Sequence, residues 1–160
     1  MEKLEVVGGK KLSGVLKISG SKNASLPILA ASLLSNKKIE LINLPQVKDI
    51  KTMLTLLESL GSSVKKVGKK TIIDNFNQKK TEANYNIVRL MRGSFLVLGP
   101  LLAKFGKAKV SSPGGCSIGV RPIDIHLNAL TKLGVKIKIV DGYVIANAPQ
   151  GLKGAKIRFP

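Results

Sequence analysis

Apolar residues recur at helical spacing in the middle of the chain. Between residues 49 and 60 they stand three and four positions apart, at Ile50, Met53, Leu54, Leu57 and Leu60. This spacing predicts an amphipathic helix, which Gly61 ends. Residues 92–105 are apolar on most sides, which predicts a buried helix. Two further helices are expected, one from the N-cap Ser21 to about Leu34 and one from Pro122 to Leu133.

Short β-strands are predicted between these helices, where small runs of apolar residues are bounded by turn-forming residues. Asp141-Gly142 is the strongest turn signal in the chain and predicts a hairpin. A second strand pair is expected across Gly68. The predicted strands are residues 4–7, 15–18, 39–42, 63–67, 71–73, 108–111, 135–140 and 143–146.

An internal repeat relates two parts of this pattern. Residues 57–67 match residues 130–140 at a constant offset of 73 positions, and the match continues to Ile72 and Ile145. Each copy consists of a strand, a helix and two strands. A period this long indicates repeated supersecondary units, each with one apolar helix face to bury. The pattern therefore predicts an α/β domain of repeated β-α-β-β units, with helices inside and sheets outside.

Composition narrows the class of protein. With 160 residues, 44% of them hydrophobic, the chain is long and apolar enough for one folded domain. No apolar run approaches the roughly 18 residues of a membrane span, and the N-terminus resembles no secretory signal. A single cysteine and a single histidine exclude an intrachain disulfide and disfavour a metal site. We therefore expect a cytoplasmic protein with no metal, no other cofactor and no membrane partner.

The net charge of +18 suggests an anionic partner. Nucleic acid is one interpretation of such a charge. However, the lysines are scattered, often as pairs in loop-like places, and aromatic residues amount to 4%, which leaves few platforms for base stacking. A small anionic substrate fits the charge at least as well, so nucleic acid is the less favoured partner.

Two stretches carry cations in contexts that suit an anion. Residues 19–23 form a Gly/Ser turn at a predicted helix start, where free N–H groups, the helix dipole and Lys22 favour phosphate or carboxylate; a plain helix cap is the alternative. Arg89 and Arg92 stand three positions apart and would share a helix face if the helix begins early enough to include both. Two guanidinium groups on one face repel unless an anion or carboxylates lie between them. Ordinary surface ion pairing is the alternative for each arginine.

The third stretch, residues 113–126, combines three glycines and two prolines with the only cysteine, Cys116, and the only histidine, His126. This composition predicts a loop that leads into a helix. Neighbouring cations favour the thiolate form of a cysteine, and His126 lies close enough in sequence to contact the loop. A Cys–His nucleophilic pair is one interpretation, and a purely structural histidine is the other.

Together, residues 21–23, 88–94 and 113–126 resemble the motifs of the UDP-N-acetylglucosamine 1-carboxyvinyltransferases, a branch of the enolpyruvyl transferase family. Their order and spacing agree over essentially the whole chain, except that Gly93 stands where the family usually has alanine. The resemblance implies an inside-out α/β architecture, in agreement with the internal repeat. The related 5-enolpyruvylshikimate-3-phosphate synthase shares the fold but lacks the cysteine loop.

The resemblance also implies a reaction and a site. The 3′-hydroxyl of UDP-N-acetylglucosamine adds to C2 of phosphoenolpyruvate, C3 gains a proton and phosphate leaves, which is the first committed step of peptidoglycan precursor synthesis. Cys116 matches the family's general acid at C3, the thiol that fosfomycin alkylates. Lys22, Arg92 and Arg121 match positions that hold anionic groups of the substrates, and Asn23 a position beside the reacting centre. The residues expected at the uridine nucleotide are Arg121, Pro122, Ile123, Asp124 and Ile125. Arg89 and His126 are expected as supporting residues of the site.

Length is the main departure from this resemblance, because the family's proteins are more than twice as long and have two similar domains. Residues 1–19 are expected to be strands that join the second domain, and residues 20–160 to form most of the cysteine-loop domain. The remainder of the two-domain protein, with its expected base and a further arginine, would lie beyond Pro160. Two alternatives stay open: a basic module for nucleic acid or an acidic partner, and an inactive fragment.

Overall fold

The computed structural model describes residues 3–112 and 123–159. Five α-helices, one 3-10 helix and seven strands make up the regular structure of this part of the chain. In order they are α1 (Lys22–Ser32), β1 (Ile39–Ile42), α2 (Lys48–Ser59), β2 (Ser63–Val67), β3 (Lys70–Asp74), β4 (Glu82–Ala83), α3 (Tyr85–Val88), the 3-10 helix η1 (Arg92–Val97), α4 (Leu98–Phe105), β5 (Lys107–Ser111), α5 (Asp124–Lys132), β6 (Lys136–Val140) and β7 (Tyr143–Asn147).

The strands form two sheets with matching topology. The first has the order β1-β3-β2, and the second has the order β4-β5-β7-β6, in which β4 pairs in parallel with β5. Within each β-α-β-β unit the last strand lies between the other two and pairs antiparallel with both. The register repeats as well, because Val64 pairs with Ile73 and Ile137 pairs with Ala146, 73 positions later. The predicted repeat is confirmed.

The two repeated helices end in the same way. After α2, Gly61 N–H bonds to Glu58 O and Ser62 N–H to Leu57 O; after α5, the same two bonds join residues 134 to 131 and 135 to 130. Gly61 and Gly134 adopt positive φ values of 103° and 91°. This is the glycine-terminated helix end that the sequence predicted. It turns the chain directly into the following strand in both units.

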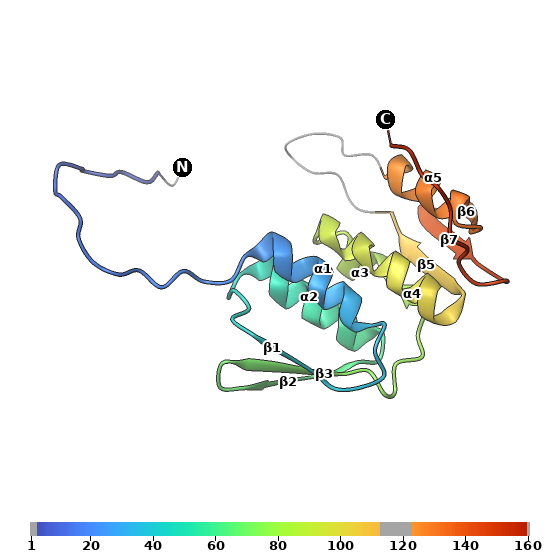
Figure 1. The fold of residues 1–160 in the computed structure, drawn as a ribbon, viewed down its shortest axis with the longest axis horizontal. Helices are drawn as coiled ribbons and strands as arrows, with labels where there is room; N and C mark the ends of the chain where they lie inside the picture. Colours follow the sequence, from blue (N-terminus) through green and yellow to red (C-terminus); the bar gives the residue numbers. More distant parts are fainter. Residues whose placement is uncertain (1–2, 113–122, 160) are drawn as a thin grey trace.

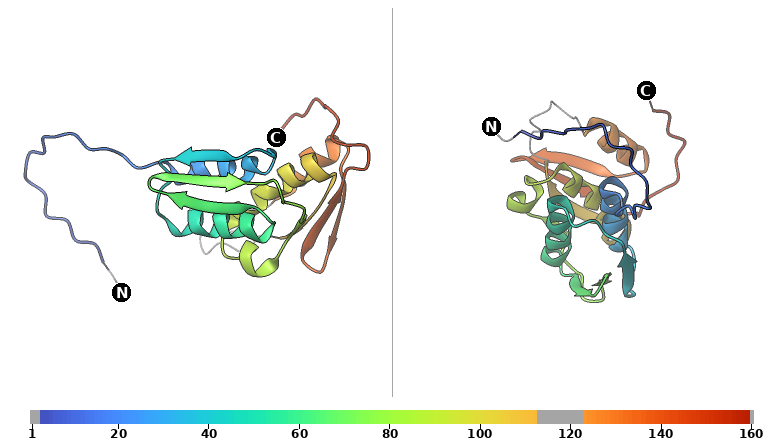
Figure 2. Two further views of the ribbon diagram at one scale, coloured as in Figure 1. Left: turned by 90° about the horizontal axis from the view of Figure 1, so that it is seen from below. Right: turned by 90° about the vertical axis from the view of Figure 1, so that its left-hand side faces the viewer.

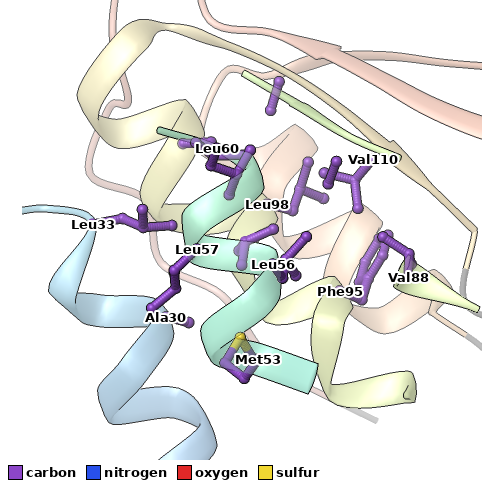
Figure 3. Close-up of a cluster of buried hydrophobic side chains, with 14 of the residues drawn as sticks. Ala30, Leu33, Met53, Leu56, Leu57, Leu60, Val88, Phe95, Leu98 and Val110 are labelled. Carbon is purple, nitrogen blue, oxygen red and sulfur yellow. The ribbon is translucent and has the colours of Figure 1, made fainter. Parts of the chain in front are cut away.

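Helices fill the interior of the molecule. Figure 1 shows α1 and α2 packed side by side over the first sheet, with α4 against β5 of the second. The view from below in Figure 2 shows the same layering. Figure 3 shows the shared core, in which Leu56 and Leu57 of α2 and its C-cap Leu60 are fully buried among residues of α1, α3, α4, η1 and β5. Burying each of these leucines contributes about 1.5–3 kcal/mol. The α/β class with helices inside is therefore confirmed.

The predicted strands at residues 4–7 and 15–18 and the predicted single helix at residues 92–105 are wrong. Residues 3–19 form no helix or strand, and extend away from the body with exposed side chains such as Leu4 and Val15 (Figure 1). A strand needs a partner, and the described chain offers none to this segment.

Residues 92–105 are not one helix but η1 followed by α4. Pro100 explains this break, because a residue without an N–H fits the first turn of a new helix.

Two elements were not anticipated, β4 and α3. They have two and four residues, too few to show a hydrophobic period. The last helix, α5, begins at Asp124, and none of its residues is fully buried. No helix among the described residues has the length and apolar character needed to cross a membrane.

Candidate functional site

A cavity of about 300 Å³ opens where several helices begin. Its polar lining comes from the first turns of α1, α2, η1 and α5, and its apolar lining from η1, from Met91 before it, from α1 and from the residue that precedes α5. The polar residues are Lys22, Asn23, Asp49, Arg92 and His126; the others are Leu26, Met91, Gly93, Phe95, Leu96 and Ile123. Three α-helices thus place their positive dipole ends, together with a lysine and an arginine, around one space. Such an arrangement favours a bound anion.

The start of α1 is set by local sequence. Ser21 is the N-cap, and its Oγ accepts a hydrogen bond from Ala24 N–H at 3.3 Å. Ser25 Oγ donates back to the carbonyl of Ser21 at 2.7 Å. Lys22 and Asn23 are therefore the first two residues of the helix, where their side chains reach the cavity. This confirms the predicted cap and helix start.

A close backbone approach positions the same turn. A Cβ built on Gly20 would overlap the carbonyl oxygen of Asn43 and lie 3.2 Å from the Asn43 carbonyl carbon and 3.4 Å from Cδ of Pro45. Only glycine allows the chain entering α1 to pass this close to the end of β1. The contact anchors Lys22, two residues later, to the first sheet.

Lys22 is paired within the cavity. Its Nζ lies 2.9 Å from Asp49 Oδ2, and the two side chains are 47% and 33% exposed. Asp49 stands in the first turn of α2, where the helix dipole stabilises a carboxylate. Sequence reasoning missed Asp49. Its only signal was an acid at the start of a predicted helix, and nothing in the sequence places that start beside Lys22.

His126 forms part of the opposite wall. Its ring meets the Phe95 ring edge-on, with centroids 6.5 Å apart and an interplanar angle of 89°. Phe95 is buried, so it fixes one face of the otherwise exposed histidine. The predicted supporting residue His126 is thus found at the cavity with Ile123, the residue that precedes α5.

Arg89 stands apart from this group. It is exposed, and its guanidinium lies 5.6 Å from the centroid of the Tyr85 ring rather than among the described residues that line the cavity. Arg89 and Arg92 could share a helix face only if one helix contained both residues, and this condition is not met. Helix α3 ends at Val88, and Met91 is extended (φ −155°, ψ 124°) before η1 begins at Arg92.

The structure therefore brings together Lys22, Asn23, Arg92, Ile123 and His126, which come from three separate sequence motifs. Asp124 and Ile125 follow in α5 with exposed side chains and do not line the cavity. The expectations for Cys116, Arg121 and Pro122 fall outside the described residues. Within residues 3–112 and 123–159, no group of three or more His, Cys, Asp or Glu side chains is placed to hold a metal ion.

Repeated units with helices inside, and a cation-lined cavity at the helix starts, define the class of protein. The chain belongs to the EPSP synthase (3-phosphoshikimate 1-carboxyvinyltransferase) family, whose model matches residues 6–160. Over 160 residues the chain is 68% identical to the UDP-N-acetylglucosamine 1-carboxyvinyltransferase of Pelagibacter ubique (strain HTCC1062). It is 52% identical to the enzyme of that name from Wolinella succinogenes. The chain spans 38% of the length of each of these relatives.

Solved structures show the same fold. The enolpyruvyl transferase NikO from Streptomyces tendae matches 91% of this chain with a TM-score of 0.74 and 23% identity, over 32% of its own length. EPSP synthase from Acinetobacter baumannii matches 89% of this chain with a TM-score of 0.66 and 18% identity, over 33% of its own length. These likenesses concern the architecture alone.

Proposed function

We propose that this chain is part of an enzyme that transfers the enolpyruvyl group of phosphoenolpyruvate to the 3′-hydroxyl of UDP-N-acetylglucosamine. The observation that carries the proposal is the convergence of Lys22, Asn23 and Arg92 on one cavity. Identity of 68% over the whole chain to a relative named for this reaction supports the choice of substrates. The product is the enolpyruvyl ether of the nucleotide sugar, and one phosphate is released.

The proposed roles follow from charge and position. Lys22 and Arg92 hold the phosphate and carboxylate groups of the substrates, and the starts of α1 and α2 add their dipoles. Asn23 lies beside Lys22 and supplies an amide for the reacting centre. The apolar wall of Leu26, Met91 and Phe95 lowers the local dielectric, which strengthens these contacts.

The remaining assignments rest on the family motif. Cys116 delivers a proton to C3 of phosphoenolpyruvate, so that C2 becomes electrophilic when the sugar hydroxyl attacks it. The hydroxyl proton passes to a base. The bond from C2 to the phosphate oxygen then breaks while C3 gives a proton back to the Cys116 thiolate, so the vinyl group is regenerated and phosphate leaves. Arg121 holds an anionic substrate group, and residues 121–125 contact the uridine nucleotide. Arg89 and His126 stay proposed as supporting residues.

We also propose that the chain is the N-terminal part of a two-domain protein. Residues 1–19 would join the second domain and residues 20–160 would form most of the first. Three features support this division: the chain spans 38% of its relatives, apolar side chains of residues 3–19 are exposed, and α5 has no fully buried residue. The reading frame downstream of Pro160 tests this directly, since a two-domain protein requires it to continue.

A cytoplasmic location and a role in peptidoglycan synthesis complete the proposal. Both follow from the reaction, whose substrates are a phosphorylated metabolite and a nucleotide sugar. The reducing cytoplasm also keeps the single cysteine, Cys116, in its thiol form.

Fosfomycin labelling tests the proposed chemistry. The protein expressed from its complete reading frame is incubated with fosfomycin and UDP-N-acetylglucosamine, and its peptides are analysed by mass spectrometry. We expect one adduct, on Cys116, and none in Cys116→Ala. Cys116→Asp separates the two roles of the thiol, because an aspartic acid can donate a proton but forms no fosfomycin adduct. Absence of label from the wild-type loop would remove the assigned role.

A further inference from the structure

The ion pair between Lys22 and Asp49 joins the starts of two helices at the cavity. Lys22 is the first residue of α1, Asp49 is the second of α2, and both line the cavity. Lysine carries its charge on a flexible four-carbon stem, which loses rotamer freedom when the ammonium is held in one place. An unpaired Lys22 would bear that cost each time it bound an anion. The contact of 2.9 Å to Asp49 holds the ammonium before any ligand arrives.

Asp49 is itself well placed to hold a cation. The N-cap of α2, Val47, makes no side-chain hydrogen bond, so the positive end of the helix dipole is uncapped and favours the charged form of Asp49 in the first turn. Side-chain exposure of Asp49 is 33%, whereas both side chains of the Glu40–Lys70 pair on the first sheet are more than half exposed. The Lys22–Asp49 pair is therefore less screened by solvent than an ordinary surface pair.

We propose that Asp49 is a positioning residue for substrate binding. It holds the Lys22 ammonium at the cavity and occupies one of its three N–H donors, which leaves two for a phosphate or carboxylate. This inference rests on the proposed function, because that function assigns Lys22 to an anionic group. Asp49 also repels an anion directly, so the two effects have opposite signs. Positioning predicts weaker binding when Asp49 loses its charge, and repulsion predicts tighter binding.

A double-mutant cycle with Lys22→Met and Asp49→Asn separates these effects. The protein is expressed from its complete reading frame, and the Kd of phosphoenolpyruvate is measured by calorimetry beside KM and kcat. Asp49→Asn removes the charge and keeps the shape. We expect it to raise Kd and KM for phosphoenolpyruvate about tenfold, with a smaller effect on kcat. In the Lys22→Met background the same substitution should change Kd less than about twofold, because Asp49 acts through Lys22.

Controls distinguish positioning from stability. Glu40→Gln breaks an ion pair of the same kind away from the cavity and should leave Kd unchanged. Asp49→Glu keeps the charge and should recover most of the affinity. Thermal unfolding of each variant shows whether α2 still folds.

Four outcomes of these measurements would overturn the inference. Unchanged or tighter binding in Asp49→Asn would assign no positioning role to Asp49. An equal loss of affinity in both Lys22 backgrounds would make its effect structural. If Lys22→Met itself left Kd unchanged, the anion-binding role in the proposed function would fail together with the inference. If Lys22→Met weakened binding and Asp49→Asn did not, the inference alone would fail.

Discussion

Replacing Gly20 with alanine isolates the contact that anchors the start of α1. The φ of Gly20 is not in the left-handed region, so alanine meets no backbone strain there, only a steric limit. Its Cβ would overlap Asn43 O, and real Cβ contacts do not fall below 3.0 Å. To relieve the overlap, the chain entering α1 must move by about 1 Å. Lys22 and Asn23, two and three residues later, must move with it.

The size of the effect follows from this displacement. Overpacking of this kind costs about 1–3 kcal/mol of unfolding free energy. For a chain of this length each kcal/mol lowers Tm by about 2–4 °C. A displacement of about 1 Å in a binding constellation costs on the order of 100-fold in rate. Gly20→Ala is therefore expected to reduce kcat/KM far more than its stability loss alone would explain.

The assay combines thermal unfolding with steady-state phosphate release. Gly99→Ala is the matched control, because a Cβ there meets nothing within 4 Å, its backbone is not left-handed, and it lies in α4, outside the residues proposed to join the second domain. We expect Gly99→Ala to keep the kcat/KM of the wild type and to have a Tm equal to that of the wild type or slightly higher, because alanine favours a helix over glycine. If Gly20→Ala also matched the wild type in Tm and in kcat/KM, the argument that the β1 end positions Lys22 would be refuted.

Three further substitutions test buried polar groups and close packing in this domain. Asn75→Ala should cost about 2–3 kcal/mol in urea unfolding, because Asn75 is fully buried, accepts from Ser62 Oγ at 2.6 Å and donates to the carbonyl of Ser32 at 2.7 Å; Asn77→Ala, at an exposed position, should cost little. Gly93→Ala should change stability by less than about 1 kcal/mol and KM by less than about twofold, since its Cβ would lie 3.0 Å from the movable Cδ1 of Leu26. Burial lowers the pKa of Lys104, whose Nζ finds no hydrogen-bond partner in the described part of the chain. Lys104 therefore binds its proton less tightly in the folded protein than in the unfolded chain, so Lys104→Met should be more stable than the wild type at neutral pH. Chemical unfolding should show this difference in stability shrinking as the pH rises through the folded-state pKa toward the ordinary lysine value.

The sequence predicted the parts of the fold that depend on local pattern. The helix at residues 49–60 appears as α2, displaced by one residue, because its apolar spacing and Gly61 both act locally. The repeat predicted the shared topology because each unit carries its own helix, glycine stop and strand pair. Ser21 predicted the start of α1 for the same reason, since a cap bonds within its own turn.

Features that depend on distant partners were not predictable from one sequence. Residues 15–18 have a strand pattern but find no neighbour, so they stay extended and exposed. Arg89 and Arg92 are close in sequence, yet the extended residue Met91 separates their helices. Asp49 joins the site only because α1 and α2 pack side by side, which brings its carboxylate to Lys22.

The central claim is that the cations of this cavity serve enolpyruvyl transfer to a nucleotide sugar. It is tested most directly by following phosphate release from phosphoenolpyruvate by the protein expressed from its complete reading frame. We expect release only when UDP-N-acetylglucosamine is present, one enolpyruvyl ether for each phosphate, and severe loss of both in Lys22→Met. Release that requires shikimate 3-phosphate instead, or release that Lys22→Met leaves unchanged, would contradict it.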